Sequence, residues 1–242
     1  MSIFQLFHQN SKFKRERPAD PRDTSKWPES WTTTFYKEYE RYPVFELGQR
    51  EELSMPLGAV IEKRHSSRTY LCNITDAQLS SLLWYTSGEI DQDAVYGRGR
   101  RASASAGARY PIETYVLLAK STATIPAGTY HYSVRRHALE ALPSEALSPD
   151  VLQKLFRYPE TSTAGAIFVY TGIFQRETNK YGERGYRNVL LEAGGIGEQL
   201  YLVCGALGVG CVGMSGYEDY ALENHLGVDG ITESVVHSVV VG

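Results

Sequence analysis

The sequence predicts an α+β fold, in which helices pack on a sheet. From Pro56 onward, segments with apolar residues at helical spacing alternate with short segments rich in β-branched and aromatic residues. Residues 186–207 add one long helix, which is apolar nearly all round and ends at Gly208. Such a helix requires burial on every side, and a dimer interface is the economical way to provide it.

The first 55 residues differ in character from the rest and are predicted to form an extended, aromatic-rich arm, followed by one domain over residues 56–242. Residues 12–28 are rich in Lys, Arg, Asp and Pro and show almost no apolar periodicity. Because the arm holds few aliphatic residues, it cannot form its own core, and we expect it to lie on this subunit or on a partner. Its aromatic anchors are Trp27, Trp31, Phe35, Tyr36, Tyr39, Tyr42 and Phe45.

The elements of the domain follow in order. Thr75 begins a T-x-x-Q capping box, and the helix behind it places Leu79, Leu82 and Leu83 on one face before Gly88 ends it. Alternating or continuous apolar runs then predict strands over residues 113–119, 128–132, 164–174, 210–214 and 234–241.

Composition narrows the functional classes. A chain of 242 residues that is 42% hydrophobic can bury a sizeable core. A net charge of −3 argues against a nucleic-acid binder held by a positive field. The three cysteines (Cys72, Cys204 and Cys211) have no framework spacing, which indicates a reducing compartment, and the last two are expected in the core. Without an evident signal peptide or membrane-length apolar run, we expect a soluble cytoplasmic protein.

The glycines of residues 208–213 match the dinucleotide fingerprint G-x-G-x-x-G letter for letter. That fingerprint functions only where a strand ends and a helix begins, because the pyrophosphate binds at the helix N-terminus. Here the order is reversed, so Gly208 is interpreted as a left-handed residue that ends a helix. A Rossmann domain is therefore not expected.

Two polar segments are candidate ligand sites. Arg64-His-Ser-Ser-Arg68 places two arginines four residues apart, so that on a helical turn they would converge with a serine hydroxyl and suit phosphate oxygens. Residues 101–111 combine small side chains with Gly107 and close with Tyr110-Pro111, which allows a flat ligand close to the backbone. Taken singly, each segment also fits a solvated basic turn or an ordinary loop.

Lys180-Tyr181 is the strongest candidate for chemistry. A lysine and a phenol side by side can act as a proton-transfer unit in a dry site, although two surface side chains before a helix would have the same spacing. Adjacent helical residues point about 100° apart, so both reach one cavity only near a helix end or in a loop. The nearby Gly182 and Gly185 are consistent with that geometry.

Other chemistries have little support. The six histidines show no metal-ligand spacing, so no metal is predicted. Gly213-Met-Ser-Gly216 falls short of a nucleophile elbow, which argues against a hydrolase. Arg135-Arg-His137 is expected to form a solvated hairpin turn.

Taken together and in order, these segments resemble the nitroreductase superfamily and, within it, the SagB/McbC-type flavin dehydrogenases. Members of that group oxidise thiazoline or oxazoline rings in ribosomally made peptides to thiazoles or oxazoles. The resemblance covers roughly residues 56–242. The matching segments are Arg64–Arg68, Ser105–Gly107 with Tyr110-Pro111 and Glu113, Pro126–Tyr132, Lys180–Arg187 and Leu190–Gly194.

This resemblance implies a nitroreductase-like fold with a mainly antiparallel central sheet, a long buried helix at a homodimer interface, and FMN in two interface sites. In the implied site, Arg64, Ser66 and Arg68 would hold the phosphate and ribityl end with His65 nearby, Ser105, Ala106 and Gly107 would reach the flavin from the partner subunit, and Met214, Ser215 and Gly216 would border the isoalloxazine.

The implied reaction removes two electrons and two protons from the ring. A base takes the acidic ring proton, and hydride leaves to flavin N5. Either Lys180 is a neutral base whose pKa is lowered by burial or by nearby arginines, or it stays cationic and lowers the phenol pKa of Tyr181. The sequence does not choose between these two routes.

Two other functional classes are consistent with these sequence features. An NAD(P)H-dependent reductase of nitro or quinone substrates would have the same fold without needing Lys180-Tyr181. A non-catalytic member would use the arm to engage a cyclase or carrier partner. The chain departs from the family pattern at Ala104, Arg109, Gly195 and Glu198-Gln199, where the family favours proline, an aliphatic residue, histidine and Gln-Asn.

Overall fold

The computed structural model describes residues 2–12, 24–68, 73–92 and 99–242, and Cys72 lies outside these ranges. Its centre is a seven-stranded sheet in which every described ladder is antiparallel. In spatial order the strands are β1 (Val44–Glu46), β6 (Ala138–Ala141), β5 (Gly128–Ser133), β4 (Ile112–Leu118), β7 (Ala166–Ile173), β9 (Glu233–Val241) and β8 (Cys211–Met214). The predicted α+β fold and its mainly antiparallel sheet are thus confirmed.

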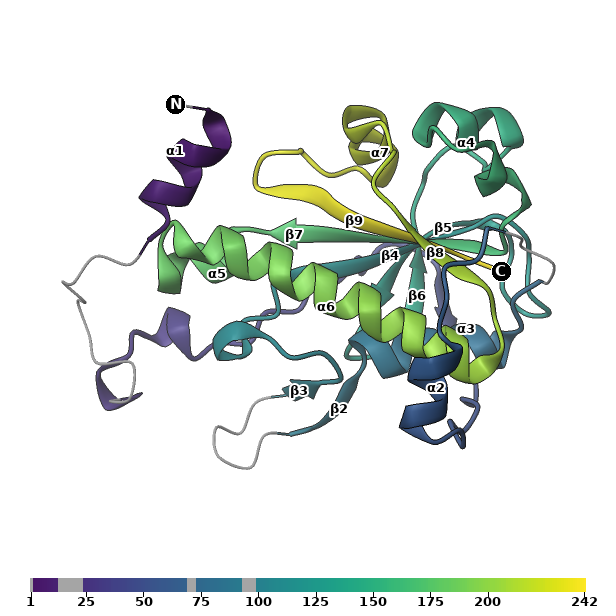
Figure 1. Ribbon diagram of the computed structural model, residues 1–242, viewed down its shortest axis with the longest axis horizontal. Helices are drawn as coiled ribbons and strands as arrows, with labels where there is room; N and C mark the ends of the chain where they lie inside the picture. Colours follow the sequence, from purple (N-terminus) through teal and green to yellow (C-terminus); the bar gives the residue numbers. More distant parts are fainter. Residues whose placement is uncertain (1, 13–23, 69–72, 93–98) are drawn as a thin grey trace.

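Helices cover both faces of this sheet. On one side lie α3 (Asp76–Ser87) and α6 (Arg184–Leu207), and on the other lie α4 (Pro149–Leu155) and α7 (Asp219–Leu226) (Figure 1). The remaining helices are α1 (Ile3–Asn10), α2 (Leu57–Lys63) and α5 (Gln175–Tyr181), and a small separate sheet pairs β2 (Glu89–Gln92) with β3 (Gly99–Arg101).

The alternation of side chains along the strands explains this three-layer arrangement. In β4, Val116 and Leu118 pack into the core beneath α3 and α6, whereas Tyr115 and Leu117 pack into the second core beneath α4 and α7. Successive residues of a strand point to opposite faces, so a strand with two covered faces is apolar throughout.

The predicted helix boundaries are largely confirmed. Thr75 caps α3 through the expected capping box with Gln78, and Gly208 ends α6 in the left-handed conformation (φ 70°). Cys204 and Cys211 are buried free thiols, as expected. The long helix begins at Arg184, two residues before the predicted start, because α5 closes at Tyr181 and Gly182 reverses the chain between them.

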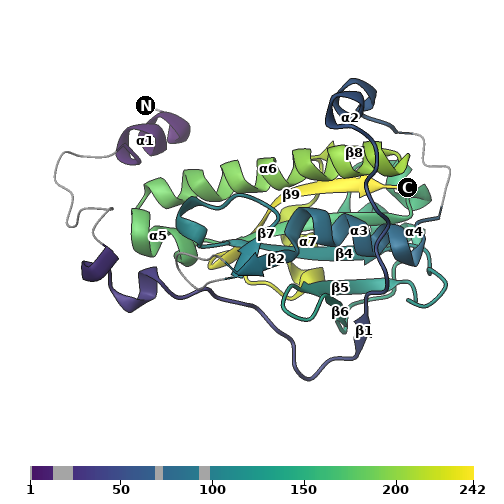
Figure 2. The same cartoon turned by 90° about the horizontal axis from the view of Figure 1, so that it is seen from below.

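Within one subunit the long helix keeps an uncovered face, because Leu190 and Leu191 are 41% and 75% exposed and Gly194 and Gly195 have open space beyond the backbone. The dimer interface expected to cover this face stays a prediction. One expectation needs correction. His137 is not solvated in its hairpin turn, since its ring lies between Ser80 and the Tyr132 hydroxyl. The described arm reaches the sheet through β1, which pairs with β6 along the sheet edge (Figure 2).

Candidate active site

Lys180 and Tyr181 are the last two residues of α5. The helix ends there because Gly182 takes a positive φ of 56°, a conformation that costs other residues energy. Gly185 then allows α6 to begin against the backbone of Glu177, since a Cβ on Gly185 would lie 2.7 Å from the Glu177 carbonyl carbon. The pair therefore sits at a helix end, where two adjacent side chains can reach one place.

Gly107 is the place that both side chains reach. It has φ 63°, and a methyl group on it would overlap the Tyr181 hydroxyl and lie 2.9 Å from Lys180 Nζ. The loop of residues 105–107 and the Lys180-Tyr181 pair thus belong to one constellation within the same subunit. The sequence singled out both segments, but their contact across more than seventy residues is a result of the fold.

The charge environment of Tyr181 keeps its proton in place. Burial raises the pKa of Tyr181, the nearby Glu177 carboxyl raises it further, and the Arg109 guanidinium opposes both. Lys180 carries its ammonium 3.7 Å from the centre of the Trp27 ring and 5.5 Å from the Tyr181 ring. Aromatic faces stabilise a cation, so this contact favours the charged form of Lys180.

A second group of predicted residues lies at the other end of α6. Arg64 and His65, with Ser67, line a cavity of about 290 Å³ together with glycines 205, 208 and 210 and the Tyr201 ring. Arg64 lies 5.5 Å from that ring centre, and the Ser66 hydroxyl lies 3.2 Å from the Tyr201 hydroxyl. The exposed Arg68 does not line this cavity.

The helical turn expected for this segment is wrong. α2 ends at Lys63, and Arg64 is its C-cap residue with extended backbone (φ −56°, ψ 125°). The chain then runs alongside the start of β8, where the Ser67 N–H donates to the Cys211 carbonyl oxygen at 2.8 Å. The basic and hydroxyl side chains gather because the segment follows the strand, and helical spacing plays no part.

A third cavity, of about 510 Å³, lies between these two groups. It is lined by the loop of residues 103–106 and by one face of α6 that includes Asn188, Leu191, Glu192 and Gly195. The loop wall has only small side chains, and Gly195 opens the α6 wall, which leaves room for a flat ligand. Ser105 Oγ accepts the backbone N–H of Tyr110 at 2.8 Å, which fixes the loop.

Glu192 lies within this cavity and was missed as a functional residue by the sequence reasoning. It is 7% exposed, and one of its carboxyl oxygens has no hydrogen-bond partner among the described residues. Burial raises its pKa to about 8, the Ser105 hydroxyl opposes the shift, and Glu177 adds to it. The signal available in the sequence was a carboxyl group within the matching segment Leu190–Gly194 of a largely apolar helix.

Glu177 is a second buried acid of this region. One oxygen accepts from the Asn188 side chain at 3.0 Å, and the other has no partner among the described residues. Burial raises the pKa of Glu177 to about 7, and the hydrogen bond from Asn188 opposes that shift. Two buried acids with raised pKa values therefore lie in this region, and the charge of Glu177 acts on both Tyr181 and Glu192.

The remaining predicted residues lie apart from these cavities. Met214 ends β8, is 6% exposed and packs in the core beneath α4 and α7, while its carbonyl oxygen accepts from Ser238 Oγ at 2.7 Å. Ser215 is exposed, and Gly216 lies against the Tyr158 ring. None of these three residues lines a described cavity.

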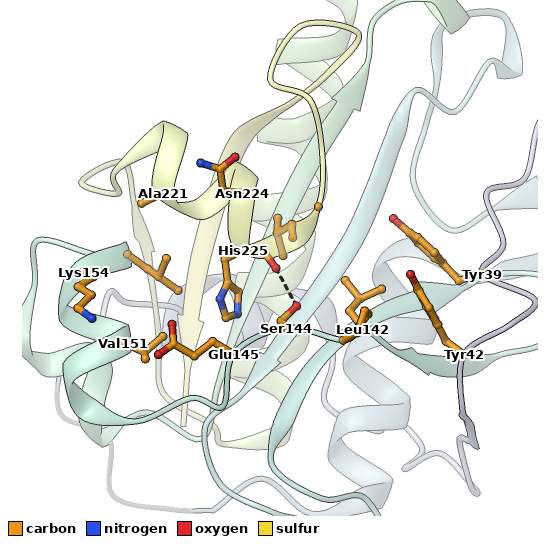
Figure 3. Close-up of a pocket in the computed structure, with 14 residues that line it drawn as sticks. Tyr39, Tyr42, Leu142, Ser144, Glu145, Val151, Lys154, Ala221, Asn224 and His225 are labelled. Carbon is orange, nitrogen blue, oxygen red and sulfur yellow. Dashed lines mark hydrogen bonds between the residues drawn. The ribbon is translucent and has the colours of Figure 1, made fainter.

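A further cavity, of about 470 Å³, lies beneath α4 and α7, on the side of the sheet away from α6 (Figure 3). His225, Ser144 and Glu145 lie at its centre, and the rings of Tyr39 and Tyr42 close one end. The hydrogen bond drawn in Figure 3 joins Ser144 Oγ, the donor, to the His225 carbonyl oxygen at 2.7 Å. None of the predicted site residues contributes to it.

The described residues contain no cluster of three His, Cys, Asp or Glu side chains placed to hold a metal ion. Among the helices of the described part, none is at once long and apolar enough to cross a bilayer.

A family model described as the nitroreductase family matches residues 61–242. The chain belongs to the nitroreductase family. This is an oxidoreductase family whose members bind FMN, so the superfamily expected from the sequence motifs is confirmed.

Three curated relatives are similar to this chain. The putative nitroreductase MJ1384 of Methanocaldococcus jannaschii is 28% identical over 72% of this chain and 88% of its own length. The trifolitoxin-processing protein TfxB of Rhizobium leguminosarum is 32% identical over 67% of this chain and 46% of its own length. The microcin B17-processing protein McbC of Escherichia coli is 32% identical over 55% of this chain and 50% of its own length. The chain therefore spans about half the length of the two processing proteins it matches.

Solved structures show the same fold. A putative nitroreductase from Anabaena variabilis has a TM-score of 0.73 at 21% identity, covering 99% of this chain and 46% of that one. The Escherichia coli microcin synthetase McbBCD complex with truncated pro-MccB17 contains a similar chain. Its TM-score is 0.61 at 22% identity, and the match covers 99% of this chain and 91% of that one. A putative nitroreductase in complex with FMN from Desulfovibrio desulfuricans has a TM-score of 0.52 at 16% identity, covering 78% of this chain and 86% of that one.

Proposed function

We propose that this chain is an FMN-dependent dehydrogenase that oxidises a thiazoline- or oxazoline-type ring, bound to a peptide or carrier, to the azole in natural-product biosynthesis. The observation that carries this proposal is the convergence of Lys180 and Tyr181 on Gly107, which joins a proton-transfer pair to the loop expected at the flavin. The similarity to two proteins named for peptide processing supports the substrate class.

The residues present fit a flavin mononucleotide. The cavity beside Arg64 and His65 combines cationic and hydroxyl donors with three glycines, a donor set that suits phosphate oxygens. The cavity between residues 103–106 and α6 has small side chains on its loop wall and Gly195 on its helix wall, which suits a flat ring system. We assign the phosphate end to the first group and the ring end to the second, with Ser66 and Arg68 supporting the first.

The distance between the groups favours a site shared by two subunits. Gly107 and Lys180 lie beside the start of α6, whereas Arg64 lies near Gly205, close to its end. A helix of 24 residues is about 36 Å long at 1.5 Å per residue. The proposed homodimer, formed through the exposed face of α6, would place the Arg64 group of one subunit beside the partner's loop of residues 105–107.

The chain's own residues would then handle the protons. Oxidising the ring removes two electrons and two protons, and bound FMN supplies the two-electron acceptor. The loop of residues 105–107 orients the substrate azoline ring against the Lys180-Tyr181 pair. Either Lys180 or Tyr181 takes the acidic proton of that azoline ring. The second proton leaves with the electrons as hydride, so charge and mass balance.

Two divisions of labour fit this pair. If Lys180 is the base, it must be neutral when the ring binds, and the Trp27 contact that stabilises its charge must be lost. If Tyr181 is the base, the Lys180 cation must overcome the raised pKa that burial and Glu177 give the phenol. The variants described next separate these routes.

The test is the oxidation of a small azoline by flavin-loaded protein carrying Lys180→Ala, Lys180→Arg or Tyr181→Phe. Loss of a general base lowers kcat by about a hundredfold or more. Lys180→Arg keeps the cation but not a titratable amine, so its activity indicates Tyr181 as the base, and its inactivity indicates Lys180. The exposed Lys154→Ala is the matched control. Full azoline oxidation by both Lys180→Ala and Tyr181→Phe would contradict the proposal.

A second function, an NAD(P)H-dependent reductase of nitro or quinone substrates, is supported by the similarity to a putative nitroreductase. It does not need the Lys180-Tyr181 pair. Rapid NAD(P)H oxidation by the wild-type protein, unchanged in Lys180→Ala, would favour this function over azoline oxidation. A protein purified without flavin absorbance that also binds no added FMN would argue against both enzymes.

A partner protein is part of the proposal. The similar chain in the McbBCD synthetase works within a complex that holds its precursor peptide. We propose that a cyclase or carrier protein delivers the ring to this chain as well. Co-purification of an azoline-bearing peptide or carrier with the inactive Lys180→Ala variant would support such a partner.

A further inference from the structure

An aromatic segment of the N-terminal arm covers the Lys180-Tyr181 pair. Lys180 Nζ lies 3.7 Å from the centre of the Trp27 ring and 5.8 Å from that of Trp31. The two tryptophan rings meet edge to face, with centroids 6.1 Å apart and planes at 68°. Trp31 is tied to the end of α5, because its indole N–H donates to the Asn179 carbonyl oxygen at 3.1 Å.

Arg109 fastens this segment to the domain. It is fully buried, and its guanidinium donates to three backbone carbonyl oxygens, those of Ser30 at 2.6 Å, Thr33 at 2.8 Å and Arg176 at 3.1 Å. The first two belong to the arm and the third belongs to α5. Arginine alone offers a fork wide enough for this arrangement. The departure from the family pattern at Arg109 therefore has a structural role here, which is to join the arm to the helix that carries the pair.

The Trp27 ring and a substrate ring cannot occupy the same side of Lys180 at the same time. Gly107 closes one side of Lys180 Nζ, since a methyl group on it would come within 2.9 Å. Trp27 closes another side at a distance that leaves no room for a second ring between its face and the ammonium. A base must come within hydrogen-bond reach of the proton it takes. A flat substrate ring can meet Lys180 on this side only where Trp27 now lies.

The segment is held by its hydrogen bonds to Arg109 and by half-buried aromatic rings, of which only Tyr36, its last residue, packs against the core beneath α3 and α6. No residue from 25 to 36 is fully buried, so residues 25–35 can move without uncovering either core of the domain. Elements with few buried contacts belong to the low-stability part of a fold and open most readily. The covering segment can therefore move while the sheet and its cores stay intact.

We propose that residues 25–36, called the lid segment below, close the proton-transfer pair in the resting state, with Trp27 as the residue that a flat substrate ring must displace. While the lid segment is closed, the Trp27 ring stabilises the Lys180 cation and blocks its approach. When it opens, the amine loses that stabilisation and becomes reachable. The catalytic meaning of this movement rests on the proposed function, whereas the closure itself does not.

Chemical labelling measures the closure without any substrate. The full-length protein is treated briefly with formaldehyde and a borane reductant, and methylation of Lys180 is measured by mass spectrometry relative to the exposed Lys154 in the same sample. Lys180 in the wild-type protein is expected to react more slowly than Lys154. Trp27→Ala is expected to speed the labelling of Lys180 about tenfold, the scale of a desolvated cation–π contact.

Three further variants make the result specific. Trp27→Phe keeps an aromatic face and is expected to stay within about twofold of the wild-type rate, because a smaller ring still covers the ammonium. Arg109→Lys removes the fork that holds the lid segment and is expected to speed labelling with Trp27 still present. Tyr42→Ala, which removes an arm ring stacked on Tyr39 away from Lys180, is the matched control and should leave the rate unchanged.

The outcomes separate the lid from the proposed function. Lys180 labelling that equals Lys154 labelling in the wild-type protein, or that Trp27→Ala leaves unchanged, would overturn the lid. With an azoline substrate, Trp27→Ala is expected to lower KM several-fold while Lys180→Ala remains inactive. Protection of Lys180 in a protein that oxidises no azoline would preserve the lid and remove only the proposed substrate.

Discussion

Gly107 lies directly against the side chain of Lys180. A methyl group on the glycine would lie 2.9 Å from the ammonium nitrogen and would overlap the Tyr181 hydroxyl. The positive φ of 63° at Gly107 is what turns the loop toward α5. Loop, lysine and phenol therefore form a single constellation, in which a change at the glycine acts directly on the proposed proton-transfer pair.

Gly107→Ala is expected to lower azoline oxidation by at least tenfold, because the added methyl displaces both side chains from their shared position. The left-handed backbone adds about 1–2 kcal/mol of destabilisation. The matched control is Gly227→Ala, with φ 73° and open space around it, which carries the same strain far from the pair. Thermal unfolding measures the strain in both variants. Equal activity in the two variants would mean that the contact with the pair has no catalytic importance.

The exposed face of α6 gives a prediction for the oligomer. Leu191 is 75% exposed, lines the cavity beside the loop of residues 103–106, and stands one turn from the open Gly194 and Gly195. Leu191→Glu is expected to convert the proposed homodimer to monomer and to lower the flavin occupancy. Light scattering and flavin absorbance measure both. Ile231→Glu, at a site 80% exposed on a loop, is the control. A monomeric wild-type protein with full flavin would refute the shared site.

Glu192 predicts an unusual dependence of stability on pH. Its pKa rises from 4.5 to about 8 on folding, mainly through burial. Between these values the unfolded chain releases a proton that the folded chain keeps, so the free energy of unfolding falls as pH rises, by up to about 1.4 kcal/mol per pH unit from this group. Below pH 4.5 the group contributes no slope.

Glu192→Gln is therefore expected to stabilise the protein, by an amount that grows from pH 5 to pH 8. Urea unfolding at each pH measures the difference from the wild type. Glu183→Gln replaces an exposed carboxylate just before the same helix and should give a difference that does not change over this range. A stability gain for Glu192→Gln that is the same at pH 5 and pH 8 would show that this carboxyl ionises normally.

A buried ionic network fixes the middle of the sheet. His131 on β5 is fully buried, with Nδ1 2.8 Å from Glu140 and Nε2 3.1 Å from Glu113, which also pairs with Arg176 at 2.5 Å. Burial opposes the charge on Glu113, but Arg176 and His131 outweigh it and hold its pKa at about 2. Burial likewise opposes the charge on His131, but the two glutamates outweigh it and raise its pKa.

His131→Gln is expected to destabilise the protein by about 3 kcal/mol at pH 6, because it removes the cation that lies between two buried carboxylates, of which Glu113 still pairs with Arg176 but Glu140 loses its ion pair. The contribution of Glu113 is present above pH 4.5 and is lost as the pH falls toward 2. That of His131 is present below pH 6.5 and is lost as the pH rises through its raised value. His225→Gln, in the half-buried histidine beside Thr129, is the control. Thermal unfolding from pH 2 to 9 checks both limits.

The sequence predicted much of the fold because its local signals agreed with one another. The capping box at Thr75, the stop at Gly208 and the apolar strand segments all appear where they were expected. The motifs also named the family correctly. The prediction from local sequence was wrong at Arg64, where a helical turn was expected and the chain instead runs in extended form beside β8. Local sequence could not indicate this, because β8 is brought beside the segment only by the fold of the sheet.

The sequence by itself thus determined the helix behind Thr75, the helix before Gly208, five of the strands and the family, and it drew attention to the Lys180-Tyr181 pair, because helix caps, strand patterns and motif spacing depend on nearby residues. Only the tertiary structure decided which residues surround the pair. It brought Gly107 from the loop and Trp27 from the arm to Lys180, and it buried Arg109 and Glu192. Burial and contact between distant segments come from the packing of the whole chain, and no local pattern encodes them.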